Sequence, residues 1–188
     1  MEKKQIIRES AVKVIAERGY HNTTIKMIAN DANISVGTIY NYFKNKDEII
    51  DYIFEVEHEK RIKFLNEINE DQKDISQKIE LFLDFHFNDL MENRNVGKVL
   101  IQESMIPNDR PIEHIQKFLN ELPIIFSNML KKAKENDEIR EVNCEIISNV
   151  IFHAIRGVVY TLEAKENNSN YKTAKKEIFE FILNGIKK

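Results

Sequence analysis

The sequence is poor in the residues that interrupt helices or crosslink chains. Its 188 residues include five Gly, three Pro, no Trp and one Cys. So little Gly and Pro excludes collagen-like and low-complexity chains. The single Cys144 excludes an internal disulfide framework and a cysteine-rich zinc site. No apolar run approaches the roughly 18 residues of a membrane span, and the first residues carry no signal-peptide core. We therefore expect a cytoplasmic protein that does not enter membranes.

Charge is distributed unevenly along the chain, although the formal net charge is only -3. Residues 1–50 contain eight Lys or Arg against six Asp or Glu, which gives this segment a charge of +2. The other 138 residues contain 20 basic against 25 acidic side chains and carry -5. A basic segment attached to an acidic body directs the search for a polyanionic partner to the N-terminal segment.

Apolar residues recur at the three- and four-residue spacing of amphipathic helices, and no stretch alternates like a strand. We predict an all-α fold of about nine helices. The first helix contains the apolar stripe that starts at Ile7 and ends at Gly19. The others are expected at residues 25–31, 36–43, 45–70, 74–92, 96–105, 112–133, 143–164 and 171–186. Pro123 must either kink the helix over 112–133 or begin a separate one.

The first three helices predict a helix-turn-helix. Thr23 and Thr24 are the N-cap candidates for the first short helix and Ser35 is the candidate for the second. A brief turn joins these two helices, which pack on the longer first helix. Asn45 followed by Glu48 has the spacing of a capping box, in which each side chain binds a backbone amide at the helix start. The next helix is therefore expected to follow the head with no flexible linker.

The most specific pattern lies between residues 19 and 50. It consists of GYHNTT at 19–24, Ile28 with Ala29, and ANISVGTIYNYFKNKDEII at 32–50. This pattern closely resembles the N-terminal signature of the tetracycline-repressor (TetR) family of transcriptional regulators. The remaining three quarters of the chain is similar to that family in length and helix count only. The resemblance implies a DNA-binding head over residues 1–45 and a helical domain for effector binding and dimerisation over 46–188.

Residue chemistry independently favours DNA contact by this head. A recognition helix presents its first turn to base edges and its amides to phosphate. Gly37 lacks a side chain where backbone would approach DNA, and Lys46 is a cation in a first helical turn, where the helix dipole disfavours it. The other candidates are short hydroxyls or polar-tipped side chains: Thr24, Ser35, Thr38, Tyr40, Asn41 and Tyr42.

By the resemblance, two groups of positions divide the DNA contacts between backbone and bases. The phosphate contacts are Thr24, Thr38, Tyr42 and Lys46. The base-reading positions are Lys26, Val36, Gly37 and Tyr40. Val36 could meet a thymine methyl, and Lys26 a guanine edge or a phosphate. The plainer interpretation makes Tyr40 and Tyr42 core aromatics and the hydroxyls simple caps.

The last two expected helices carry small residues at helical spacing, flanked by apolar ones. Gly in a helix costs about 1 kcal/mol relative to Ala, so its use there suggests close helix–helix approach. Family members dimerise through their final helices, and the resemblance therefore implies a homodimer. The expected contact residues are Ala154, Gly157, Thr161, Ile178, Ile182 and Gly185. Packing inside one chain is the alternative explanation.

The middle helices are rich in bulky apolar residues, which usually means core. In the family the same helices surround a ligand cavity, and a few polar residues among them could bind a ligand. The candidate effector-binding residues are Phe82, His86, Gln102, Phe118, Phe126 and Phe152. The large domain is loosely similar to fatty-acid-degradation repressors of the family, so an acyl chain is the leading expectation for the effector.

Nothing in the sequence points to catalysis. His58-Glu59 lacks the second histidine of a metalloprotease helix, no two histidines have metal-ligand spacing, and no Gly-rich phosphate loop occurs. We expect no enzyme activity, no metal and no cofactor. The predicted function is a homodimeric repressor of a palindromic operator in double-stranded DNA, released by a small apolar ligand. Alternatives are a multidrug-sensing repressor or an activator and, from another class, a helical adaptor or enzyme without DNA binding.

Overall fold

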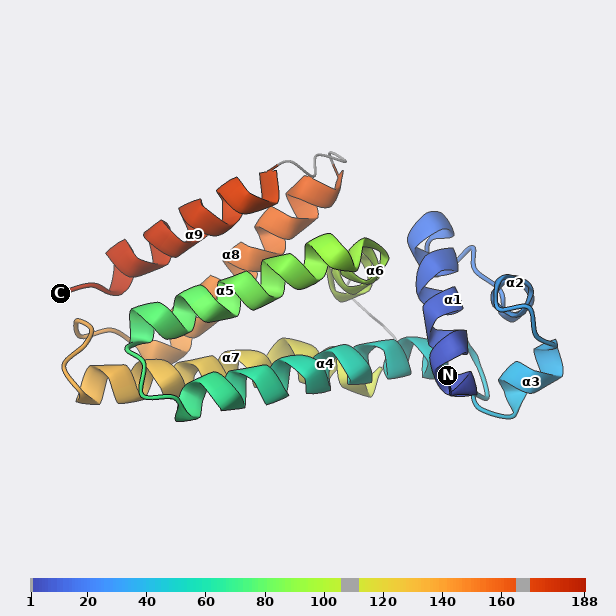
Figure 1. Ribbon diagram of the computed structural model, residues 1–188, viewed down its shortest axis with the longest axis horizontal. Helices are drawn as coiled ribbons and strands as arrows, with labels where there is room; N and C mark the ends of the chain where they lie inside the picture. The colour runs from blue at the N-terminus through green and yellow to red at the C-terminus, as the bar shows by residue number, and fades with distance from the viewer. Residues whose placement is uncertain (1, 106–111, 165–169) are drawn as a thin grey trace. The chain divides into compact units, whose positions relative to one another are not determined.

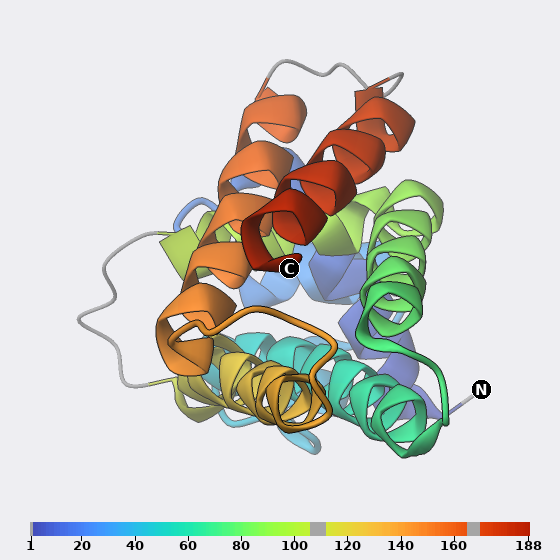
Figure 2. The ribbon, with the colours of Figure 1, turned by 90° about the vertical axis from the view of Figure 1, so that its left-hand side faces the viewer.

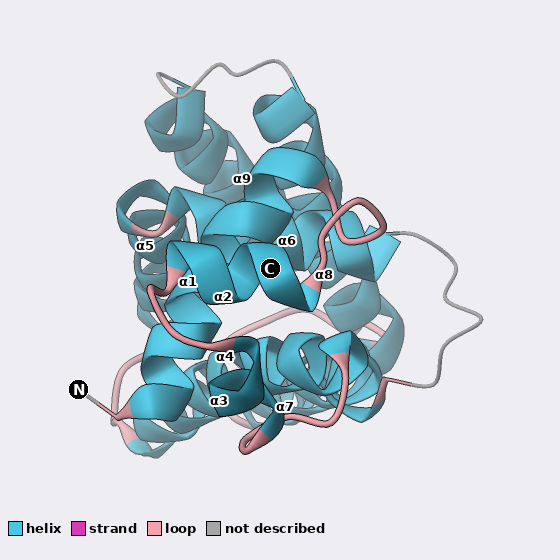
Figure 3. Ribbon diagram, turned by 90° about the vertical axis from the view of Figure 1, so that its right-hand side faces the viewer, coloured by secondary structure: helices cyan, strands magenta, loops and turns pink. Residues whose placement is uncertain are grey.

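The computed structural model describes residues 2–105, 112–164 and 170–188. Within these ranges the chain forms nine helices and no strand (Figure 3). In chain order they are α1 (Lys3–Arg18), α2 (Ile25–Asp31), α3 (Val36–Tyr40), α4 (Lys46–Glu70), α5 (Ile75–Glu92), α6 (Arg94–Met105), α7 (Glu113–Glu135), α8 (Cys144–Ala164) and α9 (Tyr171–Ile186). The all-α prediction is confirmed. None of these helices has the length and apolar content that a bilayer crossing requires.

Local capping explains where several helices start and stop. Gly19 ends α1 with a φ of 77°, a left-handed conformation that glycine adopts without strain. The carboxylate of Asp74 accepts from the Gln77 amide (2.9 Å) while the Gln77 side chain accepts from the Asp74 amide (3.3 Å), which forms a complete capping box at α5. These local signals place the end of α1 and the start of α5 close to their predicted positions.

Two expected features of the head differ in detail. The helix predicted over 36–43 ends at Tyr40, because the chain turns at Asn41 and brings the Phe43 amide to the Ile39 carbonyl (3.0 Å). Only half of the predicted capping box at α4 forms. The Glu48 amide donates to Asn45 (2.9 Å), whereas the Glu48 carboxylate accepts from the Lys44 amide (2.7 Å) rather than from that of Asn45.

Pro123 lies inside a single continuous helix, which resolves the alternative that the sequence left open. The Pro123 carbonyl accepts a hydrogen bond from the buried hydroxyl of Ser148 on α8 (2.8 Å). The missing N–H of proline takes the helical donor from the carbonyl of Leu119, four residues earlier, and the Ser148 bond to the Pro123 carbonyl is a separate contact. The contact pins α8 to α7 at the proline.

The chain divides into two compact units. The N-terminal unit is Met1–His58 with Asn93–Phe118, and the C-terminal unit is Glu59–Glu92 with Leu119–Lys188. In the N-terminal unit α1 packs against both α2 and α6 (Figure 1). In the C-terminal unit α9 packs against α5 and α8, and Figure 2 shows α8 and α9 side by side. Each unit has its own apolar core, and the helices α4 and α7 contribute residues to both.

Candidate functional site

The helix-turn-helix is held by a small apolar core and a tight turn. Ile28, Ala29 and Ile39 are buried, so α2 and α3 each anchor one face in the head. Between them Asn33 adopts a φ of 52°, and the Ile34 amide returns to the Ala29 carbonyl (3.0 Å). Asn is one of the few residues that tolerates this left-handed conformation. The turn thus fixes the direction in which α3 leaves α2.

The outer face of α3 is open to solvent. Tyr40 is 54% exposed and Tyr42 43% exposed, so neither is a core aromatic and the plainer interpretation of the two tyrosines is wrong. Ser35, Gly37 and Asn41 are exposed as well, while Val36 and Thr38 are half-buried. Every candidate on this helix can therefore be reached by a ligand outside the chain.

Gly37 is not required by packing within the chain. A methyl group placed on its Cα would meet only the Ser35 hydroxyl oxygen, at an ordinary 3.7 Å. The backbone is helical there, so no positive φ demands glycine. Since Gly lowers helix stability by about 1 kcal/mol relative to Ala, its presence fits a close approach from outside.

The hydroxyl candidates do act as helix caps. Thr24 accepts from the Met27 amide (3.2 Å), and Ser35 accepts from the Thr38 amide (3.0 Å) while its hydroxyl also lies 2.9 Å from that of Thr38. Both caps are exposed. A capping hydroxyl retains a further hydrogen-bonding position, so the cap role leaves a phosphate contact open.

Lys46 has partners inside the head that the sequence did not reveal. Its ammonium group donates to the carbonyls of Tyr20 (2.5 Å) and Thr23 (2.6 Å) and lies 4.0 Å from the centre of the Tyr20 ring. The Tyr20 hydroxyl in turn donates to Asp47. The loop between α1 and α2 is therefore tied to the first turn of α4, and this tie explains the lysine independently of DNA.

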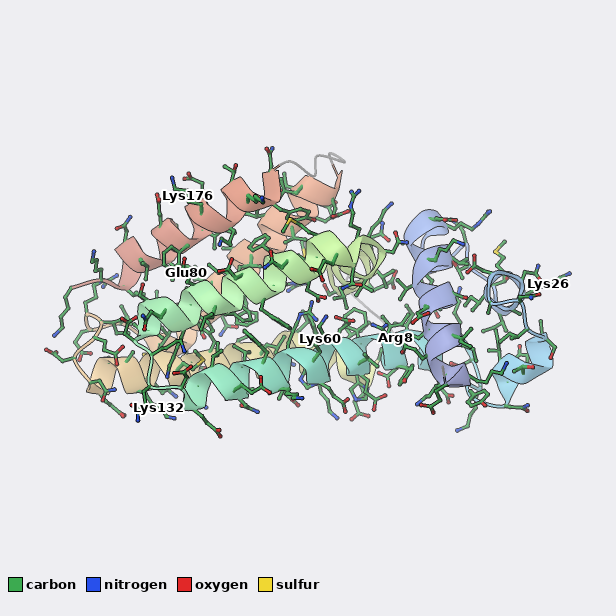
Figure 4. The ribbon with its side chains drawn as sticks, in the orientation of Figure 1. Arg8, Lys26, Lys60, Glu80, Lys132 and Lys176 are labelled. Carbon is green, nitrogen blue, oxygen red and sulfur yellow. The ribbon has the colours of Figure 1, made fainter. Side chains whose placement is uncertain are left out.

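Exposed cations flank the helix-turn-helix. Lys26 extends from α2 into solvent (Figure 4), and the Lys44 side chain is 88% exposed although it pairs with Glu48. Lys44 was not among the predicted DNA contacts. The one signal for it in the sequence is its position between Tyr42 and Lys46, which were both predicted. An exposed short helix with hydroxyl, tyrosine and lysine side chains around it can bind phosphate and present groups to base edges.

Four of the predicted effector residues form one aromatic cluster in the C-terminal unit. The rings of Phe82, Phe126 and Phe152 lie 5.6–5.9 Å apart, and the His86 ring stacks on Phe82 at 6.0 Å. Phe118 and Gln102 belong to the N-terminal unit instead, where Phe118 packs edge-on against Phe54. The cluster is thus built from α5, α7 and α8.

His86 is the polar member of this cluster, and it is held neutral. Burial and, to a smaller extent, the nearby Arg61 guanidinium lower its pKa, Asp89 opposes them, and the net result is a pKa of about 3. The Nδ1 atom of His86 is inaccessible to water and has no hydrogen-bond partner among the described residues. Arg61 is itself buried and donates to Asp89 (3.0 Å). A neutral imidazole with an unused nitrogen can accept or donate one hydrogen bond to an uncharged polar group.

The predicted self-association residues separate into two groups. A methyl group added at Gly157 or Gly185 would meet no atom within 4 Å, so packing inside the chain does not explain these glycines. Ile178 and Ile182 are only 7% and 4% exposed, which corrects their assignment to a partner-facing surface. The helical spacing of apolar residues correctly predicted an apolar face on α9, but this face is buried inside the C-terminal unit of the same chain. The large exposed apolar residues of α8 and α9 are Ile146, Val150, Tyr160 and Phe181.

The described ranges contain no group of three His, Cys, Asp or Glu side chains arranged to hold a metal ion. Cys144 is buried at the start of α8.

This fold, with an exposed recognition helix joined to a larger helical domain, defines the class of DNA-binding regulators with a helix-turn-helix head. Residues 7–53 match the profile described as bacterial regulatory proteins, tetR family, and residues 54–185 match that of the YsiA-like protein, C-terminal region. The chain belongs to the TetR family, whose members are transcriptional regulators.

The chain is similar to fatty acid regulators over nearly its whole length. It is 30% identical to the fatty acid metabolism regulator protein of Bacillus subtilis (strain 168), over 97% of this chain and 94% of the relative. The crystal structure of the transcriptional regulator FadR from Bacillus subtilis in complex with stearoyl-CoA matches with a TM-score of 0.89 at 28% identity, covering 98% of this chain and 100% of that one. The fatty acid degradation regulator FadR from Bacillus halodurans matches with a TM-score of 0.85 at 26% identity, over 97% and 99% of the two chains.

Proposed function

We propose that this chain is a homodimeric repressor that binds a palindromic operator and releases it when a long-chain fatty acyl-CoA binds. The observation that carries the proposal is the whole-length similarity to a regulator solved with stearoyl-CoA. The aromatic cluster supports it, because such a cluster can enclose an acyl chain. The protein acts in the cytoplasm, where the chromosome lies, and has no catalytic role in this proposal.

The head, residues 1–45, makes the DNA contacts. The phosphate contacts are Thr24, Thr38 and Tyr42, together with Lys46 in the first turn of α4, and the base contacts are Lys26, Val36, Gly37 and Tyr40. Ser35, whose hydroxyl can also bind phosphate, and Asn41 complete the DNA-facing set. The exposed face of α3 and the open space at Gly37 support this assignment. Two heads in a dimer would occupy successive major grooves about 34 Å apart, which is why the operator is expected to be a palindrome.

Residues 46–188 dimerise and bind the effector. Two observations support a two-fold contact through α8 and α9. These helices expose the apolar side chains of Ile146, Val150, Tyr160 and Phe181, and there is open space around Gly157 and Gly185. Phe82, His86, Phe126 and Phe152 line the effector site, and the unused nitrogen of His86 meets an uncharged polar atom of the effector. Gln102 and Phe118 remain candidates for this site.

The effector acts through α4. This helix begins directly after the head and continues into the C-terminal unit without a break, so a ligand that shifts it carries the head along. Coupling of about 1–3 kcal/mol would lower operator affinity 5- to 150-fold, and the operator would weaken effector binding by the same factor.

The test measures operator affinity by fluorescence anisotropy with and without saturating stearoyl-CoA. Stearate and free CoA serve as matched controls, because each carries half of the proposed effector. We expect loss of affinity with stearoyl-CoA alone. Release by other apolar compounds but not by stearoyl-CoA would favour the multidrug-sensing alternative, and the absence of any DNA binding would favour the helical adaptor.

A further inference from the structure

Buried charged side chains inside the N-terminal unit come from three different helices. Arg8 of α1 is 7% exposed, and Glu57 of α4 and Glu103 of α6 are each 4% exposed. His58 and Ser104, next to the two glutamates, are buried as well. Charged groups rarely leave water unless they are paired, so each of these side chains has a structural or functional reason to be there.

Arg8 uses only part of its guanidinium. Its Nη2 atom donates to the Glu57 carboxylate, which ties α1 of the head to α4. Its Nε–H is buried and has no acceptor among the described residues. A buried donor without an acceptor is costly, whereas a guanidinium can serve two carboxylates at once or in turn. Arg8 is therefore strained in its bonding even though it forms an ion pair.

Glu103 is the second buried carboxylate of the same unit. It lies on α6, and α6 packs against α1, the helix that carries Arg8. Glu103 has an interaction of its own in the chain, so an approach to Arg8 would replace one contact with another. Arg8 therefore belongs to a helix, α1, that contacts both α4 and α6, and each of these two helices carries a buried carboxylate.

We propose that Arg8 is a positioning residue for operator binding that exchanges between two carboxylates. In the operator-binding arrangement it pairs with Glu57, so that α1 and the helix-turn-helix move with α4. In the released arrangement α6 shifts along α1, and Arg8 turns to Glu103. The inference rests on the proposed function for its biological trigger, which is the acyl-CoA effector. In this proposal both arrangements are populated before any effector binds, which makes the exchange a property of the ligand-free protein.

The test uses the full-length dimer and a duplex operator selected from random sequences. Glu57→Gln weakens the operator-binding arrangement, and operator affinity without effector should fall by about fivefold or more. Glu103→Gln weakens the released arrangement, and affinity should rise, by up to the same factor. Glu55→Gln, a half-buried glutamate two residues before Glu57 on α4, is the matched control and should bind like wild type.

A purely structural role predicts that both substitutions lower affinity or that neither changes it, and either result would overturn the exchange. Reversed signs would overturn it equally. If a glutamine variant does not fold, Glu57→Asp and Glu103→Asp can replace it, because aspartate keeps the charge on a shorter side chain. Operator affinity should again fall in the Glu57 variant and rise in the Glu103 variant.

A second measurement separates this inference from the proposed function. Half-maximal release should need several-fold more stearoyl-CoA in Glu103→Gln than in wild type. If stearoyl-CoA releases neither protein, the proposed effector is wrong, while opposite signs without effector would still support the exchange. If release is normal but the two substitutions act with the same sign, the exchange is wrong and the effector stands.

Discussion

The ammonium group of Lys46 has a structural role inside the head that is separate from its predicted contact with DNA. It binds the Tyr20 and Thr23 carbonyls and so holds the loop before α2 against α4. It is also only half-buried, next to the exposed helix-turn-helix. A phosphate contact by Lys46 remains a prediction, and it would come from a cation whose position the loop carbonyls already determine.

Lys46→Ala should weaken binding to every duplex, because a lost phosphate contact does not depend on sequence. The slope of log affinity against log salt should decrease by about 1 per subunit. Salt titrations of anisotropy measure both quantities. Lys132→Ala removes an exposed cation of α7, outside the head, and should leave the slope unchanged. An unchanged slope in Lys46→Ala would show that its role is confined to the loop.

His86 predicts a pH dependence of stability. Its pKa is about 3 in the folded chain, below the value of about 6.5 for an unperturbed histidine. Between these values the unfolded chain binds a proton that the folded chain does not, so the free energy of unfolding falls as the pH falls from about 6.5 towards 3. His86→Phe removes this proton and keeps a ring against Phe82. The variant should lose less stability than wild type between pH 7 and pH 4.5, by an amount of order 1 kcal/mol or more.

Guanidinium chloride unfolding at the two pH values measures this difference. Identical pH dependence in wild type and His86→Phe would mean that the folded imidazole protonates without opposition.

At the scale of elements, α3 depends on its cap because it is only five residues long. Such a short helix is unstable alone, and here the Ser35 cap and the buried Ile39 hold it in place. The candidate recognition surface therefore owes its order to residues at its start and underside.

Ser35→Ala should lower the free energy of unfolding by about 1 kcal/mol, the usual value of an N-cap. Ser35→Asp retains a capping oxygen but adds a negative charge where we place phosphate. Thermal unfolding reports the role of Ser35 as a helix cap, and operator affinity reports its role in DNA contact. Ser35→Asp should unfold like wild type and still bind DNA much more weakly. Wild-type affinity in this variant would remove Ser35 from the DNA interface.

Sequence patterns predicted elements better than their partners. The bounds of α2 agree because Thr24 and the turn at Asn33 are local signals. The length of α3 was overestimated because Phe43 continues the apolar spacing, although the chain has already turned. The contact between Arg8 and Glu57 spans 49 positions, and no local pattern encodes such a distance.

The same limit applies to surfaces. The spacing of Ile178 and Ile182 marks an apolar face of α9 but cannot tell whether the chain or a partner covers it. The exposed residues of the head were predictable because α3 is short and its inward positions are few. The neutral state of His86 was not, since it depends on residues that folding brings together.

At the scale of the whole molecule, the dimer proposal requires a partner over the exposed residues of α8 and α9. Phe181 is 67% exposed, and Gly157 has open space around it. Phe181→Asp should shift the protein towards monomer in sedimentation and greatly weaken operator binding, while helix content stays unchanged. Gly157→Leu should act in the same direction, because an added Cβ there meets no atom of this chain within 4 Å and the larger side chain would lie where we place the partner.

Lys172→Asp places the same charge on another exposed part of α9 and serves as the control. It should remain dimeric with full affinity. A Phe181→Asp protein that is also a stable dimer would exclude this surface from self-association.

The contact between α1 and α6 has a practical consequence for building chimeric regulators. A hybrid that joins the head of this chain to a foreign sensor at residue 45 would leave behind α6, one of the two helices on which α1 packs. The head of this hybrid would be less firmly held, and transcription from the repressed promoter without an inducer would be higher. A transplant that also carries residues 93–118 should repress more tightly in a reporter strain than one cut at the end of the helix-turn-helix.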